Sequence, residues 1–347
     1  MNYMPCGSFR IMFVFSCILL SVSISGQEIH FSQFLNTPTL NNPANTANSD
    51  GDWRVVNNYR NQWRSVSIPF TTIAAGYEQK IYPKNINCGV GGYFINDNSG
   101  ALGLNVNKIL LSSSASAMFR NNLIRIGIQP GFVYRLYNNN NMTLPLQFNE
   151  DPDYGGFFDR NIQGGESGLG ERSFYFTLNM GATWTRKYRN YTPTAGFSWN
   201  NVNRPRDSFQ KHFREYHIPF KHVYFGSVKI DANQHISITP VVMYMRQRRA
   251  VETVIGVNAG YNMGKNMKAL KGLNAGAYFR KSDWLRAEAM IVAMGFDVMR
   301  VHAEVSYDIN VSGLSEVSNY RGAFEIALIF TGLSTINSKY TIPCDRY

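Results

Sequence analysis

The fold is decided by the stretch Met299-Arg300-Val301-His302-Ala303-Glu304-Val305-Ser306-Tyr307-Asp308, in which every odd position is apolar or aromatic and every even position is polar or charged. Because successive side chains of a strand point to opposite faces of a sheet, this stretch predicts a strand with one apolar and one polar face. The pattern recurs at 124–136, at 323–330 and at 284–291, where Leu285, Ala287, Ala289 and Ile291 form the apolar face. Counting such segments from Trp53 to Phe330 gives about 14 strands, an even number, as in single-chain outer-membrane barrels.

The composition fits this pattern. The chain has 347 residues, of which 14% are aromatic and only 16% are charged, below the roughly one quarter that is usual for soluble proteins. The mean hydropathy of −0.24 is too low for a bundle of apolar transmembrane helices. In a transmembrane barrel, half of the strand residues face lipid and half face a polar lumen. The predicted fold is therefore all-β, a closed antiparallel transmembrane barrel, which satisfies every backbone group within lipid.

The first 26 residues have the features of a secretion signal. Arg10 supplies a positive charge, residues 11–24 form an apolar core, and Ser23-Ile24-Ser25-Gly26 offers a small-residue cleavage region, so that the mature chain would begin near Gln27. A lipoprotein signal is an alternative, because Val14-Phe15-Ser16-Cys17 is a loose lipobox. An uncleaved anchor would need about 18–20 apolar residues, more than this run provides.

Charge and cysteine content argue against several classes of function. The net charge is +11, but the Lys and Arg residues are spread along the chain, so that no nucleic-acid partner is expected. The basic cluster at 246–249 is interpreted as a solvated or headgroup-facing rim. Cys88 and Cys344 follow the signal, and whether they pair stays open. No zinc-site spacing occurs, and neither a metal nor a cofactor is predicted.

Four regions are expected along the chain. These are the signal peptide at 1–26, an N-terminal arm at 27–52, the barrel at 53–330 and a C-terminal tail at 331–347. The arm is rich in Asn and Pro and does not alternate, so it should plug or line the lumen, or lie on the periplasmic face. Two long connections, at 138–171 and 200–217, are expected to be either functional or disordered and to face away from the cell.

Local features refine the strand prediction. Turns are expected at the Asn-, Gly-, Asp-, Ser- or Lys-containing sites 96–100, 231–233 and 281–283. Pro130 and Pro240 fall inside strands, where each loses a ladder hydrogen bond, and they are expected at kinks or bulges. Gly89, Gly91 and Gly92 suit a strand that needs small residues for curvature.

No enzyme signature is present, because GxSxG, the P-loop and a GxGxxG with a following acidic residue are all missing from the sequence. His302, Glu304 and Ser306 share a polar face, but any strand facing a polar lumen yields such a trio, and the protein is expected not to be an enzyme. The charges expected in the lumen are Arg125, Arg135, Arg286 and Arg300 with Glu288, Glu304 and Glu325. They predict either a paired network that fills the interior or an anion-preferring pore, and the mixture of signs favours the network.

Both ends of the mature chain carry motifs, of which the N-terminal block is specific and the strand matches are not. The N-terminal part reads His30-Phe31-Ser32-Gln33-Phe34, Asn41-Asn42-Pro43-Ala44, Trp53-Arg54-Val55, Tyr59-Arg60-Asn61-Gln62-Trp63 and Pro69-Phe70-Thr71-Thr72. The C-terminal part reads Tyr307-Asp308, Ser312-Gly313-Leu314, Arg321-Gly322-Ala323-Phe324-Glu325-Ile326 and Ile342-Pro343-Cys344-Asp345-Arg346-Tyr347. Their order and spacing resemble the PorP/SprF family of outer-membrane proteins linked to type IX secretion. The chain departs from the family at Asp345, where a Pro is usual, and at Ala47, where the Asn-Pro-Ala-x-x-Gly motif of the family, here at 42–47, usually ends in Gly.

The resemblance implies a non-enzymatic outer-membrane barrel of the type IX secretion or gliding machinery. Such a protein would bind or anchor a secreted cargo or adhesin through the C-terminal domain of that cargo, and it would meet periplasmic components of the machine as well as outer-membrane lipid. The residues expected to fold the arm or bind a partner are Ser32, Gln33, Asn42, Pro43, Arg54, Arg60, Asn61, Gln62 and Trp63, with a C-terminal motif of Pro343, Cys344, Arg346 and Tyr347.

Two alternatives remain open. The cluster of Trp53, Arg54, Arg60, Trp63 and Arg64 suits a partner interface, but it also suits an interfacial aromatic girdle with a turn. For the whole protein, the alternatives to the anchor are a passive porin or solute channel and a membrane-embedded hydrolase.

Overall fold

The structure is a computed structural model. It describes residues 30–65, 68–99, 103–137, 148–151, 155–159, 162, 172–207, 217–264, 269–282, 286–313 and 315–333. The expected signal peptide lies outside these residues. So does the C-terminal motif of Pro343, Cys344, Arg346 and Tyr347, and with it any pairing of Cys344 with Cys88.

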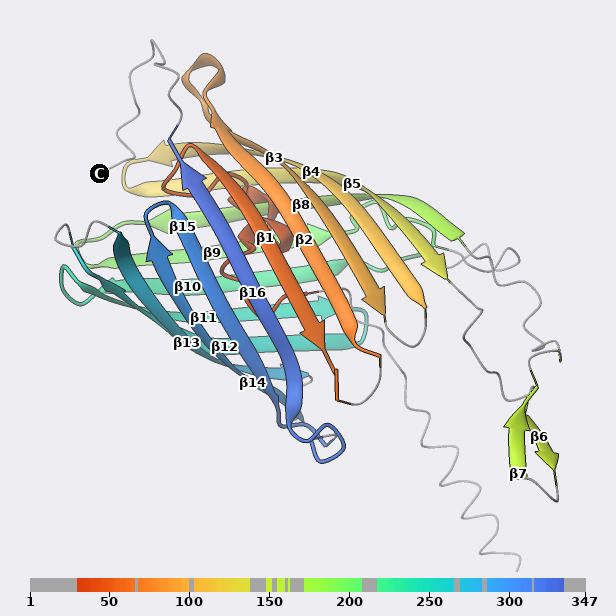
Figure 1. Cartoon of the computed structure of the whole chain (residues 1–347). Coiled ribbons are helices and arrows are strands. Elements are labelled where there is room, and N and C mark those ends of the chain that lie inside the picture. Colours follow the sequence, from red (N-terminus) through yellow and green to blue (C-terminus); the bar gives the residue numbers. More distant parts are fainter. Residues whose placement is uncertain are drawn as a thin grey trace, which may run out of the picture.

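The chain forms a closed antiparallel barrel of 14 strands, which confirms the predicted fold class and strand number (Figure 1). The barrel strands are β1 Trp53–Gln62, β2 Phe70–Ile81, β3 Asn87–Ser99, β4 Leu104–Phe119, β5 Asn122–Tyr137, β8 Arg172–Arg186, β9 Tyr191–Asn200, β10 Lys221–Asp231, β11 Ile236–Gln247, β12 Ala250–Asn262, β13 Leu270–Ser282, β14 Arg286–Val298, β15 Val301–Asn310 and β16 Arg321–Gly332. The first strand closes the barrel against the last, from Trp53↔Gly332 to Gln62↔Ala323. A separate two-stranded sheet, β6 Phe148–Asp151 and β7 Gly155–Phe158, lies in the connection between β5 and β8. A 3₁₀ turn, η2 (Pro83–Asn85), joins β2 to β3.

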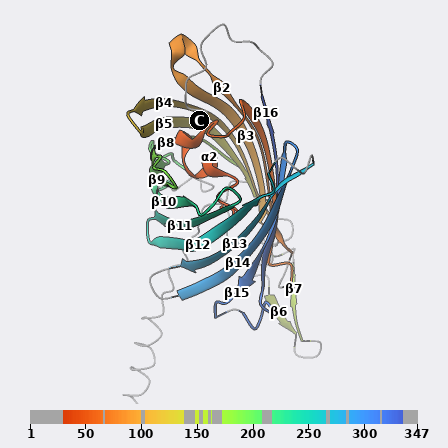
Figure 2. The same cartoon turned by 90° about the vertical axis from the view of Figure 1, so that its left-hand side faces the viewer.

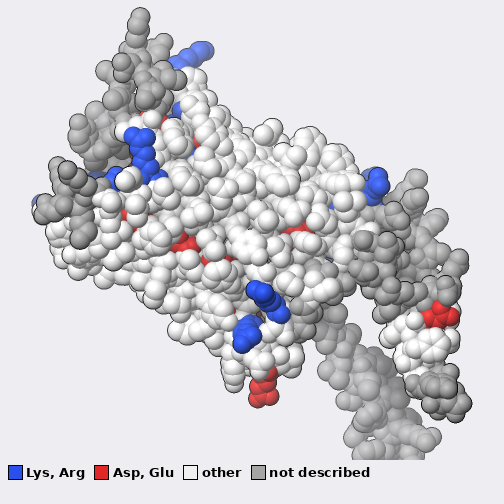
Figure 3. All heavy atoms as spheres, viewed as in Figure 1, with Lys and Arg blue, Asp and Glu red and all other residues white. Residues whose placement is uncertain are grey.

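Alternation along each strand sorts side chains between the outside and the lumen. In β5, Ile124 and Ile126 are 48% and 60% exposed, whereas Gln129 and Val133 are buried. In β15, the even-numbered residues from 304 to 310 are buried. Most of the outer face seen in Figure 3 carries neither acidic nor basic side chains. An uncharged apolar band of this kind is the surface that contact with lipid requires.

The two ends of the barrel differ. At one end the strands are joined by short turns, such as 120–121 and 299–300, and the chain enters and leaves the barrel there at Trp53 and Gly332. The opposite end carries the long connections 138–171 and 201–220. These are called the turn end and the loop end below.

The lumen is less polar than the alternation predicted. One apolar cluster surrounds Phe34 and consists of Val223, Val241, Met243, Met245, Val254, Tyr278, Ile291 and Ala293. A second surrounds Phe31 and consists of Val56, Ala74, Tyr93, Ile95, Leu110 and Ile329. These inward residues are covered by protein rather than by water, and burying apolar surface in this way is favourable.

Several local predictions were wrong. Residues 96–99 continue β3 rather than forming a turn, and Asn96 donates from Nδ2 to Asn107 Oδ1 on β4 at 2.8 Å. Lys281 and Ser282 likewise end a strand. Ile291 faces the lumen because a register shift between Arg280 and Lys281 reverses the faces of β14.

The two strand prolines remove ladder pairing as expected, but without a bulge. Opposite Pro130, the β4–β5 ladder is interrupted between Leu110↔Gly131 and Ser113↔Ile128, and it then resumes in the same register. The β10–β11 ladder is interrupted in the same way opposite Pro240. Each proline therefore removes pairing locally without the register shift that a bulge would produce.

Within the described residues, no helix has the length and apolar character needed to cross a bilayer.

Candidate functional site

The arm, defined here as residues 30–52, lies inside the barrel (Figures 1 and 2). It contains the short helix α2 (Pro38–Asn41) and the 3₁₀ helix η1 (Pro43–Asn45). At the loop end, His30 lies 3.3 Å from Glu252, near the start of β12. At the turn end, the Asp52 N–H donates to the Gly332 carbonyl at 2.8 Å. The arm therefore passes through the lumen from the loop end to the turn end.

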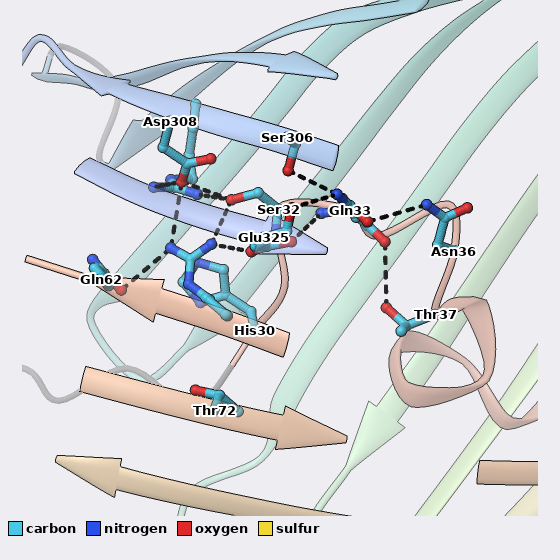
Figure 4. A network of polar contacts seen from close by, with 12 residues as sticks. His30, Ser32, Gln33, Asn36, Thr37, Gln62, Thr72, Ser306, Asp308 and Glu325 are labelled. Atoms are coloured by element: carbon cyan, nitrogen blue, oxygen red, sulfur yellow. Dashed lines mark hydrogen bonds and ion pairs between the residues drawn. The ribbon is translucent and has the colours of Figure 1, made fainter. Parts of the chain in front are cut away.

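Ser32 and Gln33 dock on the carboxylate of Glu325 (Figure 4). Their backbone N–H groups donate to its two oxygens at 2.7 and 2.9 Å. Gln33 Nε2 also donates to Ser306 Oγ at 3.0 Å, and Ser32 Oγ donates to Asp308 Oδ2 at 2.7 Å. Charge-assisted hydrogen bonds from two successive amides fix the position of the arm along the wall.

Two arginines complete this contact. Arg60 pairs with Glu325 and lies 3.3 Å from Asp308, and Arg280 Nη2 lies 2.9 Å from Asp308. All four charged side chains are buried, and Arg280 Nε also lies 3.5 Å from Glu288, so that carboxylates compensate both arginines in the low-dielectric interior. Breaking a buried pair by removing one partner costs about 3–5 kcal/mol, because the other charge is left uncompensated. The group is called the latch below, and it consists of Ser32, Gln33, Arg60, Arg280, Asp308 and Glu325.

Two phenylalanines of the arm pack on the apolar parts of the wall. Phe31 and Phe34 are 6% and 3% exposed, and each belongs to one of the two lumen clusters. The Phe34 ring meets that of Tyr278 edge-on, with centroids 5.5 Å apart. Complete burial of such a side chain contributes roughly 1.5–3 kcal/mol. The polar latch fixes the position of the arm, and these rings add apolar binding energy.

The turn at Asn42 ties the arm to strands on the other side of the lumen. Asn42 Oδ1 accepts from the Ala44 N–H at 3.0 Å, which caps η1. Its Nδ2 donates to the carbonyls of Ala182 and Phe197 at 3.1 and 3.0 Å. The side chain therefore satisfies the turn and binds β8 and β9.

Wall glycines make room for this part of the arm. A Cβ at Gly127 would collide with the backbone of Pro43, and one at Gly181 would collide with the Asn42 side chain. A Cβ at Gly89 would meet the carbonyl of Thr46. Gly89 was expected to serve strand curvature, whereas its clearest role here is close approach of the arm backbone.

Glu78 forms a second anchor near the turn end. Its buried carboxylate accepts from the hydroxyls of Thr39 and Tyr93 and from the Ala47 N–H at 2.9 Å. Arg54 Nη2 lies 2.6 Å from the same carboxylate. The arm is thus held by one buried glutamate near each end.

His30 lies at the loop end of the arm, close to the basic side chains of the latch. Burial, followed by the positive charges of Arg280, Arg60 and Lys221, lowers the pKa of His30 to about 3. The imidazole is therefore neutral at physiological pH, and its approach to Glu252 is not the ion pair of a charged histidine.

Six of the nine predicted N-terminal residues take part in contacts between the arm and the wall, at the latch, at the Asn42 turn and at Glu78: Ser32, Gln33, Asn42, Pro43, Arg54 and Arg60. Gln62 only accepts from Arg60 at 3.2 Å. Asn61 Nδ2 donates to Tyr59 Oη at 3.3 Å on the exposed face. Trp63 is 39% exposed and packs on Phe70, with centroids 5.3 Å apart. The sequence analysis missed Glu78 and Arg280, although both are charged residues inside strands whose neighbours alternate, which is a signal for a buried partner.

The expected cluster of Trp53, Arg54, Arg60, Trp63 and Arg64 is not a single surface. Trp53 and Trp63 lie at opposite ends of β1, and the two strand arginines point into the lumen. The reason is geometric, since ten strand residues separate the ends by roughly 33 Å.

Of the charged residues expected in the lumen, some face it and others do not. Arg135 pairs with Asp207, and Glu325 pairs with Arg60, as a network of opposite signs predicts. Arg286 and Arg300 are exposed at strand ends, and their placement in the lumen was wrong.

The trio His302, Glu304 and Ser306 has structural contacts. His302 Nδ1 lies 2.7 Å from Asp297 and its Nε2 lies 3.5 Å from Glu304, whereas Ser306 binds Gln33 of the arm. Within the described ranges, no three or more His, Cys, Asp or Glu residues are grouped so as to hold a metal ion.

Some space remains beside the arm. A small open cavity of about 50 Å³ lies between the arm and the wall toward the loop end. The arm contributes Phe31 and Leu40 to its lining, and the strands contribute Lys108, Asn179 and Lys221 among others. The arm therefore narrows the lumen without filling all of it.

An apolar outer band, a closed even-stranded barrel and an internal arm define an outer-membrane β-barrel protein. The chain belongs to the type IX secretion system membrane protein PorP/SprF family, whose sequence profile matches residues 23–330. This is a family of secretion-system membrane components and not a known family of enzymes. No curated protein matches the chain in sequence.

Several solved barrels have a similar fold. The CymD monoaromatic hydrocarbon channel is 8% identical with a TM-score of 0.51, over 86% of this chain and 93% of that one. A Pseudomonas aeruginosa FadL homologue is 10% identical with a TM-score of 0.49, over 85% and 94%. The P. putida toluene transporter TodX is 10% identical with a TM-score of 0.45, over 86% and 94%. At this identity, the similarity to CymD concerns the barrel fold alone.

Proposed function

We propose that this protein is a non-enzymatic anchor in the outer membrane, which holds secreted proteins of the type IX system through their C-terminal domain. The observation that carries this proposal is the arm, which occupies the lumen and is bound by a buried glutamate near each end. A barrel built for free passage would leave its lumen open. Here the inward charges and apolar patches of the wall bind the arm of the same chain. The two ends of the barrel are therefore the surfaces that remain for partners.

The ends suit different partners. Outer-membrane barrels have short periplasmic turns and longer external loops, which orients the loop end toward the outside. The connections 138–171 and 201–220 are then available to a secreted protein. The turn end faces the periplasm, where components of the secretion machine can reach it. The arm crosses the lumen between the two sides.

Cross-linking tests the proposal. The protein is purified from outer membranes in mild detergent after gentle cross-linking, and its companions are identified by mass spectrometry. We expect a secreted protein linked through its C-terminal domain, together with periplasmic secretion components. Deleting residues 27–51 should abolish display of that protein while the barrel stays inserted and heat-modifiable. Recovery of the wild-type barrel alone contradicts the anchor, and unchanged display by the deletion variant contradicts the role of the arm.

A passive channel is the second candidate, and the open cavity beside the arm is the observation that favours it. Conductance of the purified wild-type protein in a planar lipid bilayer separates the two functions. A stable ion current from the intact protein supports the channel, whereas a silent barrel with captured cargo supports the anchor.

A further inference from the structure

The barrel ladder is incomplete at one junction, between β8 and β9. On one side, β8 pairs with β5 over its whole length, from Arg172↔Leu136 to Arg186↔Asn122. On the other side, only residues 180–185 pair with β9, opposite 194–199. Toward the loop end, residues 172–179 of β8 have no strand partner on that side within the described part of the chain.

The segment 201–207 covers this edge without forming a strand. Asn201 and Arg204 have positive φ values of 59° and 43°, and a single backbone hydrogen bond, from Val202 N to Leu178 O at 2.8 Å, joins the segment to β8. Asn201 and Asp207 also accept from the Thr177 and Ser173 hydroxyls of β8 at 2.7 and 2.6 Å. The side chain of Asn203 contacts the backbone of the edge. Its Oδ1 accepts from the Leu178 N–H at 3.0 Å, and its Nδ2 donates to the Phe176 carbonyl at 2.7 Å. One side-chain amide thus occupies the place of a peptide group in an adjacent strand.

Aromatic side chains flank this edge on the outer surface. Phe132, Phe174 and Phe176 are 48%, 65% and 41% exposed, and the Phe132 ring centroid lies 5.8 and 5.5 Å from the other two. Asn200 ends the neighbouring strand β9, which at ten residues is already long enough to cross a bilayer. Residues 172–178 continue beyond that point toward the loop end, so that this edge and its aromatic residues lie at the loop-end rim of the barrel.

We propose that the edge of β8 from Arg172 to Leu178 binds an extended strand of the secreted partner, by addition of that strand to the barrel sheet. This inference rests on the proposed function and names how the partner is held. The backbone of the incoming strand replaces the Asn203 amide at Leu178 N and Phe176 O, and its outward apolar side chains pack on Phe174 and Phe176. Strand addition combines main-chain hydrogen bonds with side-chain pockets at alternate positions.

The chemistry of the edge selects a strand over a lipid chain. Acyl chains cannot hydrogen-bond to the open N–H and C=O groups of β8, and unsatisfied groups of this kind do not occur against lipid. A second possibility is that Asn203 simply seals the edge against unwanted pairing, as native proteins commonly do. If a cargo strand adds to this edge, removing an edge donor of β8 weakens cargo binding. If Asn203 only seals the edge, removing that donor leaves cargo binding unchanged.

Phe174→Pro is the variant that tests the edge. Leu178 and Phe176 direct their backbone groups toward 201–207, and Phe174 shares their direction in the two-residue repeat of the strand. Proline at this position removes an edge donor and leaves the β5–β8 ladder intact. Phe174→Leu keeps both the donor and an apolar side chain, and it is the matched control.

The probe is the C-terminal domain identified by cross-linking to the wild-type protein, and the readout is the amount bound per folded, heat-modifiable barrel. We expect at least about a tenfold loss for Phe174→Pro, the factor that corresponds to one lost hydrogen bond of roughly 1.4 kcal/mol. Phe174→Leu should bind as the wild type does, and Asn203→Ala, which opens the edge, should bind at least as well.

A photo-reactive phenylalanine analogue provides a measurement that does not depend on proline. Placed at Phe176 it should cross-link to the bound domain, whereas at Ile255, an outward residue that is 53% exposed on β12, it should not. Unchanged binding by Phe174→Pro, or equal cross-linking from both positions, overturns strand addition while the anchor function stands. If the wild-type protein binds no C-terminal domain, the proposed function itself fails.

Discussion

Replacing Glu325 by glutamine should loosen the arm while leaving the barrel closed. The glutamate carboxylate receives the Ser32 and Gln33 amides and the Arg60 guanidinium. Glutamine has nearly the same shape, but it carries no charge. Its amide NH₂ group takes the place of one carboxylate oxygen and cannot accept the hydrogen bonds that this oxygen accepts in the wild type. The change therefore removes electrostatics and one acceptor without opening a cavity.

The magnitude follows from the balance of buried charges. In the wild type, Arg60 and Arg280 face Asp308 and Glu325, all four residues are at most 3% exposed, and Glu288 lies 3.5 Å from Arg280. In Glu325→Gln, Arg60 loses its closer carboxylate partner and keeps Asp308, which it shares with Arg280. Loss of one member of a buried pair costs about 3–5 kcal/mol, which corresponds to a change of roughly 10²- to 10³-fold or more in the docking equilibrium.

Hydrogen exchange measures this change directly. Amides of residues 30–37 should lose protection by about that factor, while amides of β5 and β12 keep theirs. The control is Asp231→Asn, which removes an exposed ion pair, with 3.6 Å between Lys229 Nζ and Asp231 Oδ1, and should leave the arm unaffected. If residues 30–37 of Glu325→Gln stay as protected as in the wild type, the latch does not hold the arm.

Three further predictions concern other parts of the arm. The pKa of His30 is about 3 in the docked arm, against a reference value of 6.5, so the released arm binds a proton at pH values where the docked arm does not. Lowering the pH from about 7 to about 5 should therefore favour release and reduce the hydrogen-exchange protection of residues 30–37. This pH dependence should be weaker in His30→Gln. Gly127→Ala should displace the arm by collision with Pro43, whereas Gly226→Ala, whose new methyl group meets only a Val242 carbon at 3.4 Å, should leave arm protection unchanged. Deleting residues 30–51 should give a barrel with a measurable single-channel conductance, and a deletion variant as silent as the wild type would show that other parts of the chain close the lumen.

The strand pattern was predictable because lipid and lumen impose opposite requirements on neighbouring residues. This is why the alternation at 299–308 located β15 and gave the correct number of strands. The same rule failed wherever a register shift or a polar pair intervened. Ile291 was assigned to the wrong face because a bulge near Arg280 is invisible in a pattern with period two. Asn96 was assigned to a turn because its cross-strand partner Asn107 could not be known from local sequence.

The site was less predictable than the barrel, because its partners are far apart in the chain. Ser32 binds Glu325, nearly three hundred residues away, and no local pattern links two such positions. The motif around Ser32 and Gln33 came from family resemblance, and only the structure brings it to the latch. The arm phenylalanines show the same limit. Their apolar partners in the lumen contradict a simple polar-inside rule, which applies to a lumen wall that faces water.

The two anchors also bear on whether partner binding must open the barrel. Releasing the arm would break the contacts of Glu325 and Glu78 and would expose Phe31 and Phe34, each worth roughly 1.5–3 kcal/mol in burial alone. Binding at the β8 edge needs to displace less, since 201–203 is held to residues 176–178 by one backbone hydrogen bond, the Asn203 amide and the hydrogen bond from Thr177 Oγ1 to Asn201 Oδ1. A partner can therefore bind at the loop end while the arm stays in place, so that the energetic difference between the two contacts favours an anchor that holds cargo without becoming a pore.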